Sequence, residues 1–416
     1  MDRLKVLELF SGIGSQAKAI KRLGIDAEFT QCEIDKYAIS SYNAIHGETK
    51  NFGDITKINE NDLYKDQWDL ITYSSPCQSF SIAGKMKGLQ GQSGLLLEVE
   101  KFIRKVRPKY LLMENVKNLV GKKFINDFNN WLKVLYDYGY NNYWQVLNAK
   151  DYGIPQNRER VFVVSIRKDL KQGYEFPKKE PLKIYLSDLL EKEVDEKYYL
   201  SDKMLNYFTK ENTGKVNRKE QFLRNFKNDK KDIANTITTR NGSRATDTFI
   251  GTYQFDKSDK FMGGKNRLQI NKNISDTLLT KQKEAVVLKT QLCNKLIEEN
   301  KVKEYDIVKH SYSNDRMNKE SAVEKGSNNI SITLTTRADT IGVVVPTIDI
   351  LRIRKLTPLE TFLLMGFDKE DYEKVKVIGM SNAQMYKIMG NSIVVNVLEK
   401  IFYNLLIDKK EFDRLF

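Results

Sequence analysis

Residues 4–17 read LKVLELFSGIGSQA, and this stretch decides the fold class of the chain. Its first seven residues are largely apolar and predict a buried β-strand. A glycine-rich turn with the pattern Gly12-x-Gly14-x-x-Ala17 follows the strand and leads into an amphipathic stretch that ends at Gly24. Such a turn between a strand and a helix is typical of nucleotide-binding folds, because the glycines let the backbone approach a ligand at the helix N-terminus.

Two carboxylates follow the next predicted strand and turn. Glu33 lies about 19 residues beyond Gly14, close to the spacing at which these folds place a carboxylate on ribose hydroxyls. Asp54 follows Gly53 at a turn, from which it could accept a hydrogen bond from an adenine amino group. A solvated acidic residue is the alternative for Glu33, and a turn-forming aspartate is the alternative for Asp54.

A cysteine lies just past another predicted strand. Residues 69–73 read DLITY and predict a buried strand, and residues 74–84 continue as SSPCQSFSIAG. Pro76 fixes the backbone immediately before Cys77, and the flanking residues are small or polar, so the sulfur is not expected inside a core. A thiolate at the end of such a strand can attack carbon, whereas the alternative is a buried and inert cysteine.

The alternation of strands and helices continues to residue 167. The strand at 109–113 ends at Glu114, and a carboxylate at the end of an apolar strand is costly unless it has a function or a partner. Residues 156–160 read QNRER and lead into a strand at 161–166. Strands that alternate with helices in this way predict an α/β fold with a doubly wound, mostly parallel sheet.

The composition changes at about residue 169. A chain of 416 residues is expected to divide into two domains, since single cores stop growing at roughly 250–300 residues. Strong apolar runs become rare after residue 169 and return at about residue 350. We therefore predict a smaller domain, residues 169–349, inserted into a larger one formed by residues 1–168 and 350–416.

Three threonine-rich segments in the predicted insert each end in a basic residue. They are residues 235–240 (NTITTR), 276–281 (DTLLTK) and 332–337 (ITLTTR). Either they are ordinary β patterning, or they are edge strands of a small sheet whose loops enter a nucleic-acid groove. On the second interpretation, Arg240 and Arg337 would supply salt-dependent phosphate contacts.

The charge and the cysteine content indicate the kind of partner and the compartment. The formal net charge is +14 and the sequence pI is about 9.3, which favours an anionic partner. No apolar run reaches membrane-spanning length and the N-terminus shows no secretory pattern, so nucleic acid is favoured over a membrane. Three cysteines are too few for a disulfide framework and lack zinc-ligand spacing, so we expect no metal site and a cytoplasmic setting. We also expect a monomer.

These segments occur in one order along the chain, and in that order they resemble the cytosine carbon-5 DNA methyltransferases. The matching pieces are Phe10–Gly14, Glu33, Asp54, Pro76–Gln78, Phe80–Gly84, Ser93–Leu95, Glu114–Val116, Gln156–Arg160, Arg354–Pro358 and Gly390–Ser392. They fall within residues 1–167 and 350–407, over half of the chain. Two departures are Ser15, where many members carry a further glycine, and Gln92, where an arginine is common.

The resemblance implies that S-adenosylmethionine is the methyl donor and that the substrate is a cytosine flipped out of double-stranded DNA. Cys77 is then the nucleophile, and Glu114 hydrogen-bonds ring nitrogen 3 and the exocyclic amine. Arg158 and Arg160 would steady the carbonyl oxygen, the phosphate of the flipped nucleotide, or both. The implied cofactor-binding residues are Phe10, Gly12, Ile13, Gly14, Glu33, Ile34, Asp54, Ile55, Pro76, Asn391 and Ser392. The implied DNA-binding residues are Gln78, Ser81, Arg240 and Arg337.

Three other interpretations are weighed against this one. The nearest keeps the fold and the chemistry but acts on tRNA; the long basic insert favours DNA, because a DNA-reading domain needs that room. A nicotinamide-dependent oxidoreductase explains the glycine turn and Glu33 but leaves Cys77, Glu114 and the paired arginines without a role. A DNA-binding module that has lost catalysis is disfavoured because Cys77 and Glu114 are both present. Restriction protection, phage self-modification and solitary methylation all fit the predicted enzyme.

Overall fold

The computed structural model describes residues 3–75, 94–201, 203–204, 207, 232–244, 246–250 and 353–408 with their side chains, and the backbone of short strands elsewhere. By packing, the chain divides into two compact units, residues 1–250 with 354–416 and residues 251–353. Several predicted site residues lie outside the described residues: Pro76, Cys77, Gln78, Ser81 and Arg337. The second and third threonine-rich segments lie outside them as well.

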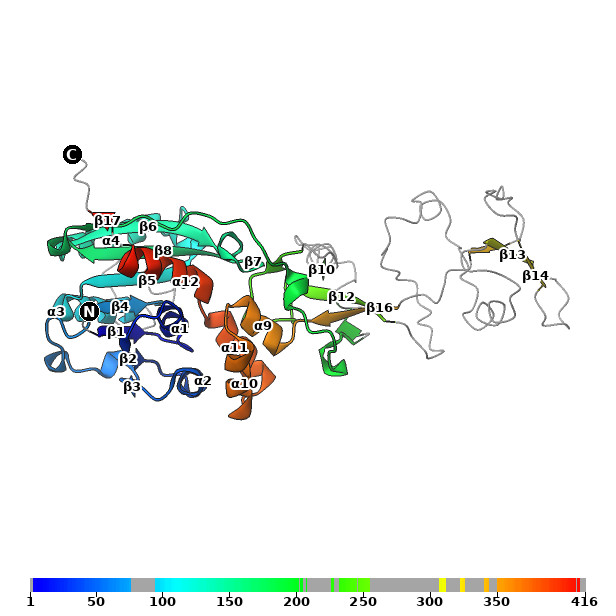
Figure 1. Ribbon diagram of the computed structural model, residues 1–416, viewed down its shortest axis with the longest axis horizontal. Coiled ribbons are helices and arrows are strands. Elements are labelled where there is room, and N and C mark those ends of the chain that lie inside the picture. The colour runs from blue at the N-terminus through cyan, green and yellow to red at the C-terminus, as the bar shows by residue number, and fades with distance from the viewer. Residues whose placement is uncertain are drawn as a thin grey trace. The chain divides into compact units, whose positions relative to one another are not determined.

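A seven-stranded sheet organises the first unit, and its strand order is β3-β2-β1-β4-β5-β8-β6 (Figure 1). The strands are β1 (Leu4–Leu9), β2 (Ala27–Cys32), β3 (Lys50–Asn51), β4 (Leu70–Tyr73), β5 (Tyr110–Val116), β6 (Tyr140–Asn148) and β8 (Glu159–Arg167). Neighbours from β3 to β5 pair in parallel, whereas β8 is antiparallel to both β5 and β6. The sheet confirms the predicted doubly wound, mostly parallel α/β fold.

Alternate residues of the strands face two hydrophobic cores. Val6 and Leu70 belong to one core, whereas their neighbours Leu7 and Ile71 belong to the other. Strands buried on both faces require this pattern, because successive side chains point to opposite sides of the sheet. The first core includes residues of α1 (Ser15–Arg22), α2 (Lys36–His46), α9 (Pro358–Leu364), α10 (Lys369–Val377) and α12 (Val395–Phe402). The second core includes residues of α3 (Leu95–Val106) and α4 (Ile125–Asp137).

The C-terminal helices differ in one detail from the expectation. The sequence predicts that residues 389–395 open a helix reaching Ile407, but Gly390 and Asn391 instead end α11 (Asn382–Asn391), with Ser392 as its C-cap. Helix α12 starts only at Val395 and continues as a π-helical turn to Ile407. The Ser392 hydroxyl donates to the Ile388 carbonyl at 2.7 Å, which satisfies one of the carbonyls that a helix end leaves free.

The first boundary between the units lies further along the chain than the composition indicates. Residues 169–250 belong to the first unit by packing, whereas the second boundary lies within a few residues of the expected one. Strand β9 (Gln172–Gly173) pairs with β17 (Lys410–Glu411), and β11 (Ala234–Asn235) pairs with β7 (Gln156–Asn157). These pairings are main-chain contacts, which the content of apolar residues does not reveal.

The second unit, residues 251–353, contains a small antiparallel sheet. Its strand β13 (Ile307–Ser311) pairs with both β14 (Ala322–Lys325) and β15 (Thr340–Val343). Target recognition is predicted for residues 169–349, which include most of this unit, and stays a prediction. Across the described part of the chain, no helix combines the length and apolar character that crossing a membrane requires.

A buried ion pair stabilises the return of the chain to the first unit. Arg354, in β16 (Ile350–Lys355), donates two hydrogen bonds of 2.8 Å to Glu360 in α9, and both side chains are at most 1% exposed. Glu360 also accepts from the backbone N–H groups of Thr357 and Glu191. The contact with Thr357 forms the capping box that the sequence predicts at residues 357–360.

We expect Glu360→Ala to lower the free energy of unfolding by about 3–5 kcal/mol, because it leaves the Arg354 guanidinium buried without a counter-ion. Urea unfolding followed by circular dichroism measures the change. The matched control is Asp137→Ala, which removes an exposed ion pair with Lys133 and should cost less than about 1 kcal/mol. Equal losses in the two variants would contradict a stabilising role for the buried pair.

Candidate active site

The turn between β1 and α1 has the left-handed backbone that favours glycine. Phe10, Gly12 and Gly14 have φ angles of 58°, 56° and 77°. A Cβ atom on Gly14 would lie 2.6 Å from side-chain atoms of Tyr42 and His46, so only glycine fits there. A Cβ atom on Gly12 would meet no described atom within 4 Å, so a ligand can approach the backbone from this side.

Three polar side chains, two of them buried and one half-buried, support the turn. The Glu8 carboxylate, in β1, accepts hydrogen bonds from the Tyr42 hydroxyl and from the Ala17 N–H. Burial raises the pKa of Glu8 to about 7. Burial also lowers the pKa of His46 to about 3, so the ring is neutral and Nε2 donates to the Ile13 carbonyl at 3.0 Å. Sequence reasoning missed these three residues, although a carboxylate inside an apolar strand is the same kind of signal that singled out Glu114.

Glu33 follows β2 and binds the glycine turn directly. Its Oε2 atom accepts from the Gly12 N–H at 3.0 Å, and Oε1 accepts from the N–H groups of Ile34 and Asp35 at 2.9 Å. A carboxylate has about four acceptor positions, so capacity remains for a ligand hydroxyl. Ile34 is 72% exposed and leaves an apolar surface beside this carboxylate.

Asn51 joins Glu33 to the loop that carries Asp54. The Asn51 side chain accepts from the N–H groups of Glu33 and Gly53 and donates to the Glu33 carbonyl, with distances of 3.0–3.1 Å. Asp54 Oδ1 accepts from the N–H and the hydroxyl of Thr56, which is the turn-forming arrangement. These hydrogen bonds lower the pKa of Asp54. Sequence reasoning missed Asn51, and no local pattern marks it.

Glu114 and Arg160 form a buried pair on neighbouring strands. Glu114 Oε1, on β5, lies 3.1 Å from Arg160 Nε, on β8, and the side chains are 10% and 17% exposed. Burial raises the pKa of Glu114, and the charges of Arg160 and Arg158 offset part of this effect. A carboxyl group with a raised pKa beside a fixed cation is suited to hold a proton and to donate a hydrogen bond.

Asn115 brings the start of the Cys77 loop next to this pair. Its Nδ2 atom donates to the Ser75 carbonyl at 2.8 Å, and its Oδ1 atom accepts from the Val116 N–H. Ser75 is the last described residue before Cys77 and lies two positions from it. Ser75 is therefore held next to Asn115, the neighbour of Glu114 in β5.

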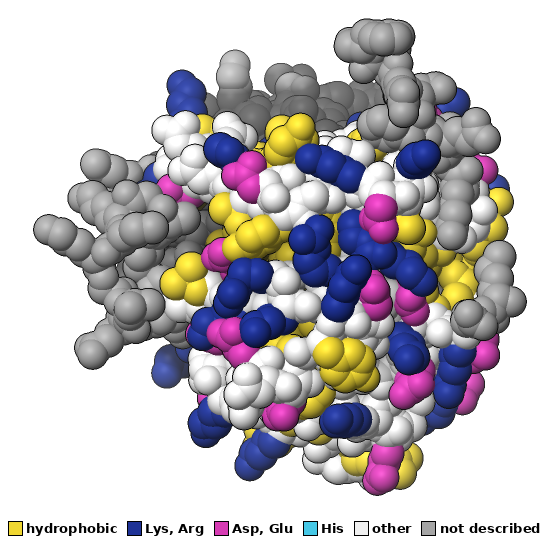
Figure 2. Space-filling view, turned by 90° about the vertical axis from the view of Figure 1, so that its left-hand side faces the viewer, with side chains coloured by type: hydrophobic (Ala, Val, Ile, Leu, Met, Phe, Trp, Pro, Cys, Tyr) yellow, Lys and Arg dark blue, Asp and Glu magenta, His cyan; other side chains and the backbone are white. Residues whose placement is uncertain are grey.

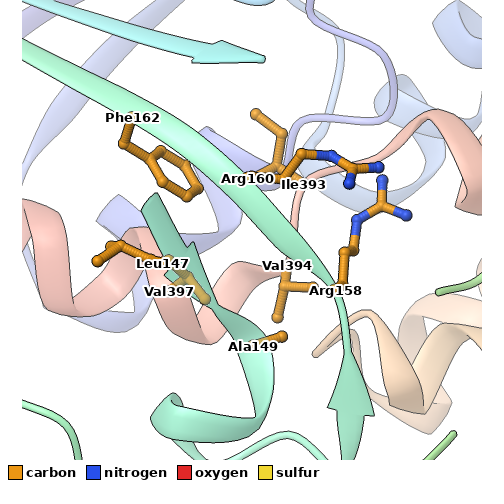
Figure 3. Close-up of a pocket in the computed structure, with 8 residues that line it drawn as sticks. All are labelled: Leu147, Ala149, Arg158, Arg160, Phe162, Ile393, Val394 and Val397. Atoms are coloured by element: carbon orange, nitrogen blue, oxygen red, sulfur yellow. The ribbon is translucent and has the colours of Figure 1, made fainter. Parts of the chain in front are cut away.

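Arg158 lies next to Arg160 but binds the protein backbone. Its guanidinium donates to the carbonyls of Ile237, Gly390 and Ser392 at 3.1, 3.1 and 2.7 Å. Figure 3 shows both guanidinium groups on the same side of a small pocket, whose other lining residues are Leu147, Ala149, Phe162, Ile393, Val394 and Val397. Burial and the neighbouring Arg160 charge lower the pKa of Arg158 to about 9, so it stays charged at neutral pH.

Ile55, another predicted residue, is buried in the short helical turn that follows Asp54. The other predicted residues that the structure describes lie at the end of α11 and in the first threonine-rich segment. Asn391 is exposed and Ser392 is buried. Lys387 of the same helix binds Asp35 at 2.7 Å, so α11 lies beside the segment that follows Glu33. Arg240 is exposed at a turn of the first unit.

The class of protein follows from where the polar groups lie. Enzymes with an open α/β sheet bind their ligands at the carboxyl ends of the strands, and Glu33 and Glu114 lie at the ends of β2 and β5. The chain matches the model of the C-5 cytosine-specific DNA methylase family over residues 4–406, and it belongs to this family of DNA cytosine-5-methyltransferases.

Phage and bacterial enzymes are among its relatives. The chain is 32% identical over 456 residues to the orphan methyltransferase M.SPRI of Bacillus phage SPR, with 98% of each chain covered. It is 37% identical over 261 residues to the type II methyltransferase M2.ScrFI of Lactococcus lactis subsp. cremoris, covering 49% of this chain and 72% of the relative. The crystal structure of the S. pombe Dnmt2 methyltransferase shares the fold, with a TM-score of 0.59, 21% identity and coverage of 98% and 99% of the two chains.

The buried Glu8 predicts a stability that depends on pH. Its pKa is about 7 in the folded chain against an ordinary value of 4.5, so its ionisation costs the folded state about 3 kcal/mol. The unfolded chain releases this proton first, so the folded state loses stability as the pH rises from about 4.5 to about 7. We expect Glu8→Gln to remove this loss, because the amide can still bind Tyr42 and Ala17.

Urea unfolding at about pH 5 and about pH 8 measures the difference between the parent and Glu8→Gln. The matched control is Glu28→Gln, at an exposed position of the neighbouring strand β2, which should follow the parent at both pH values. The same pH dependence in Glu8→Gln and in the parent would contradict the ionisation of a buried Glu8.

Proposed function

We propose that this enzyme transfers a methyl group from S-adenosylmethionine to carbon-5 of a cytosine flipped out of double-stranded DNA, through a transient covalent bond to Cys77. The observation that carries the proposal is the buried Glu114–Arg160 pair, with Asn115 holding the entry to the Cys77 loop beside it. Membership of the C-5 cytosine-specific DNA methylase family supports the same reaction.

Activation of the ring is the first requirement, because carbon-5 of cytosine is a weak nucleophile. The Cys77 thiolate adds to carbon-6, while Glu114 donates a hydrogen bond to ring nitrogen 3 and offsets the charge that develops there. Carbon-5 then takes the methyl group; loss of its proton and cleavage of the carbon–sulfur bond restore the thiolate. The base must leave the stack because both faces of the ring are used, at a cost of a few kcal/mol.

Arg160 orients Glu114 and adds fixed positive charge at the ring. Its Nε atom binds Glu114, and its Nη1 atom donates to the Glu159 carbonyl at 2.8 Å. Among the described contacts Nη2 has no partner, so this nitrogen can donate to the carbonyl oxygen of the base. Arg158 is held differently, because its outer nitrogens bind three main-chain carbonyls.

The cofactor site lies at the glycine turn. S-adenosylmethionine supplies an electrophilic methyl group when bound. Glu33 would accept from its ribose hydroxyls, and the exposed Ile34 would pack against adenine. Asp54 would use Oδ2 for the adenine amino group, because its turn-forming bonds use only Oδ1. The remaining residues of the proposed site are Phe10, Gly12, Ile13, Gly14, Ile55, Pro76, Asn391 and Ser392.

DNA is the favoured nucleic acid. The family model describes DNA methylases, and the net charge of +14 favours a polyanion. Figure 2 shows one end of the molecule, the left-hand end of Figure 1 where α3 lies, and there lysine and arginine alternate with aspartate and glutamate. This face is therefore not an uninterrupted basic surface, and we assign DNA contacts to Gln78, Ser81, Arg240 and Arg337.

We expect Cys77→Ser to abolish methyl transfer while S-adenosylmethionine still binds, because only the covalent step is lost. Incubation with labelled S-adenosylmethionine and either duplex DNA or tRNA shows which nucleic acid, if any, accepts the methyl group. Calorimetry measures the binding of the cofactor. The matched control is Cys32→Ser, which should keep activity. Cys32 donates to the Gly53 carbonyl and burial raises its pKa to about 12, so it cannot act as a nucleophile at neutral pH.

Two results would contradict this assignment. One is substantial methyl transfer by Cys77→Ser. The other is the absence of a stable adduct between Cys77 and duplex DNA that contains 5-fluorocytosine in the presence of S-adenosylmethionine, since fluorine blocks the release step. Methyl transfer to tRNA instead of DNA would keep the chemistry and change the substrate.

We expect that replacing residues 251–353 with the corresponding unit of another family member changes the methylated sequence and leaves the chemistry intact. The packing boundaries define the exchange, because residues 169–250 belong to the catalytic unit. Bisulfite sequencing of methylated plasmid DNA maps the target before and after the exchange. An unchanged target in an active chimera would show that the second unit does not select the sequence.

A further inference from the structure

We propose that Arg158 is a positioning residue that couples DNA binding to cofactor binding. This inference rests on the proposed function, since it needs both ligands. The Arg158 guanidinium joins Ile237, in the first threonine-rich segment, to Gly390 and Ser392, at the proposed cofactor site. Through such a bridge, a ligand that restricts the motion of one segment also restricts the other, so a second ligand that binds there loses less conformational entropy.

The end of α11 provides a physical reason for a charged bridge. The last carbonyls of a helix have no partner within the helix and carry partial negative charge. Gly390 lies in the last turn of α11 and Ser392 is its C-cap, so Arg158 Nη2 caps this helix end. The planar fork of an arginine reaches carbonyls in two directions, whereas a lysine is a single point of charge.

The two bridged segments also touch at the level of the backbone. A Cβ atom on Gly390 would lie 2.4 Å from the Thr239 nitrogen, so the two backbones are in close contact here. Gln156, two residues before Arg158, accepts from the Ile237 N–H at 3.1 Å and so holds the same segment. The two segments are therefore connected both by the hydrogen bonds of the Arg158 guanidinium and by direct backbone contact.

The first threonine-rich segment continues into exposed basic residues. Asp247 accepts from the Thr238 hydroxyl and from the N–H groups of Ser243 and Arg244, which orders the turn that carries Arg240. Both arginines are exposed. When a phosphate binds this turn, it also restricts residues 237–239 and with them one carbonyl that Arg158 binds.

The test is a thermodynamic cycle of binding without turnover. In a Cys77→Ser background, calorimetry gives the Kd of S-adenosylhomocysteine with and without a short duplex that carries one methylation site mapped by bisulfite sequencing. Coupling between sites typically amounts to about 5–150-fold, and we expect at least about fivefold tighter binding here. Arg158→Lys should bring this factor close to one, and reciprocity requires the same change in the Kd of the duplex.

The matched control is Arg167→Lys. Arg167 also binds a backbone carbonyl, that of Arg107, but it lies at the opposite end of β8, so the control should keep the coupling factor. Absence of coupling in the Cys77→Ser parent, or undiminished coupling in Arg158→Lys, would overturn the proposed role of Arg158 but not the proposed function. Failure of either ligand to bind the parent would overturn the proposed function as well.

A second measurement uses the unaltered chain, because Arg158→Lys can also lose stability. Binding of S-adenosylhomocysteine should slow the hydrogen exchange of residues 234–240, which comprise Ala234 and the threonine-rich segment and are not in the proposed cofactor site. In Arg158→Lys this slowing should disappear, while slowing at residues 12–16 of the glycine turn persists. Unchanged exchange at residues 234–240 in the unaltered chain would overturn the coupling.

Discussion

The structure depends on the hydrogen-bond donors and positive charges that replace water around its buried carboxylates. A buried charge is tolerated only where donors or an opposite charge meet it. Glu8 meets the Tyr42 hydroxyl, which attaches α2 to the strand that leads into the glycine turn. Glu360 meets Arg354, which fixes the return of the chain to the first unit. Glu114 meets an arginine of the neighbouring strand at the proposed site of reaction. The fold and the proposed site are thus both held by hydrogen bonds or ion pairs to buried carboxylates.

Residues 156–160 hold together segments of the first unit that lie far apart in the sequence. Gln156 and Arg158 hold the first threonine-rich segment, and Arg158 also caps the helix end at Ser392. Only Arg160 reaches Glu114. Two arginines that look equivalent in the sequence therefore differ in their contacts, because the first one is surrounded by main-chain carbonyls.

The division of the chain shows the limit of composition as a guide. Apolar runs become rare at about residue 169, and this change predicts a boundary there. Residues 169–201 and 232–250 nevertheless pack with the first unit, because scattered apolar side chains such as Tyr174 and Leu186 join its first hydrophobic core and the Glu191 N–H binds Glu360. Composition shows where apolar residues become rare along the sequence. The boundary of a packed unit is instead set by where the contacts of the chain with that unit stop.

The sequence by itself determined the mostly parallel sheet, the glycine turn and the family, because each depends on a local pattern. Apolar runs of strand length, glycines where the backbone is left-handed and carboxylates at strand ends can all be recognised without knowing what lies nearby. The tertiary structure decided the partners of Glu8, Asn115 and Arg158. Those partners include Ser392, which lies 234 positions from Arg158 in the sequence. Hydrogen bonds form only at short distances, and the packing of the chain decides which distant residues come that close.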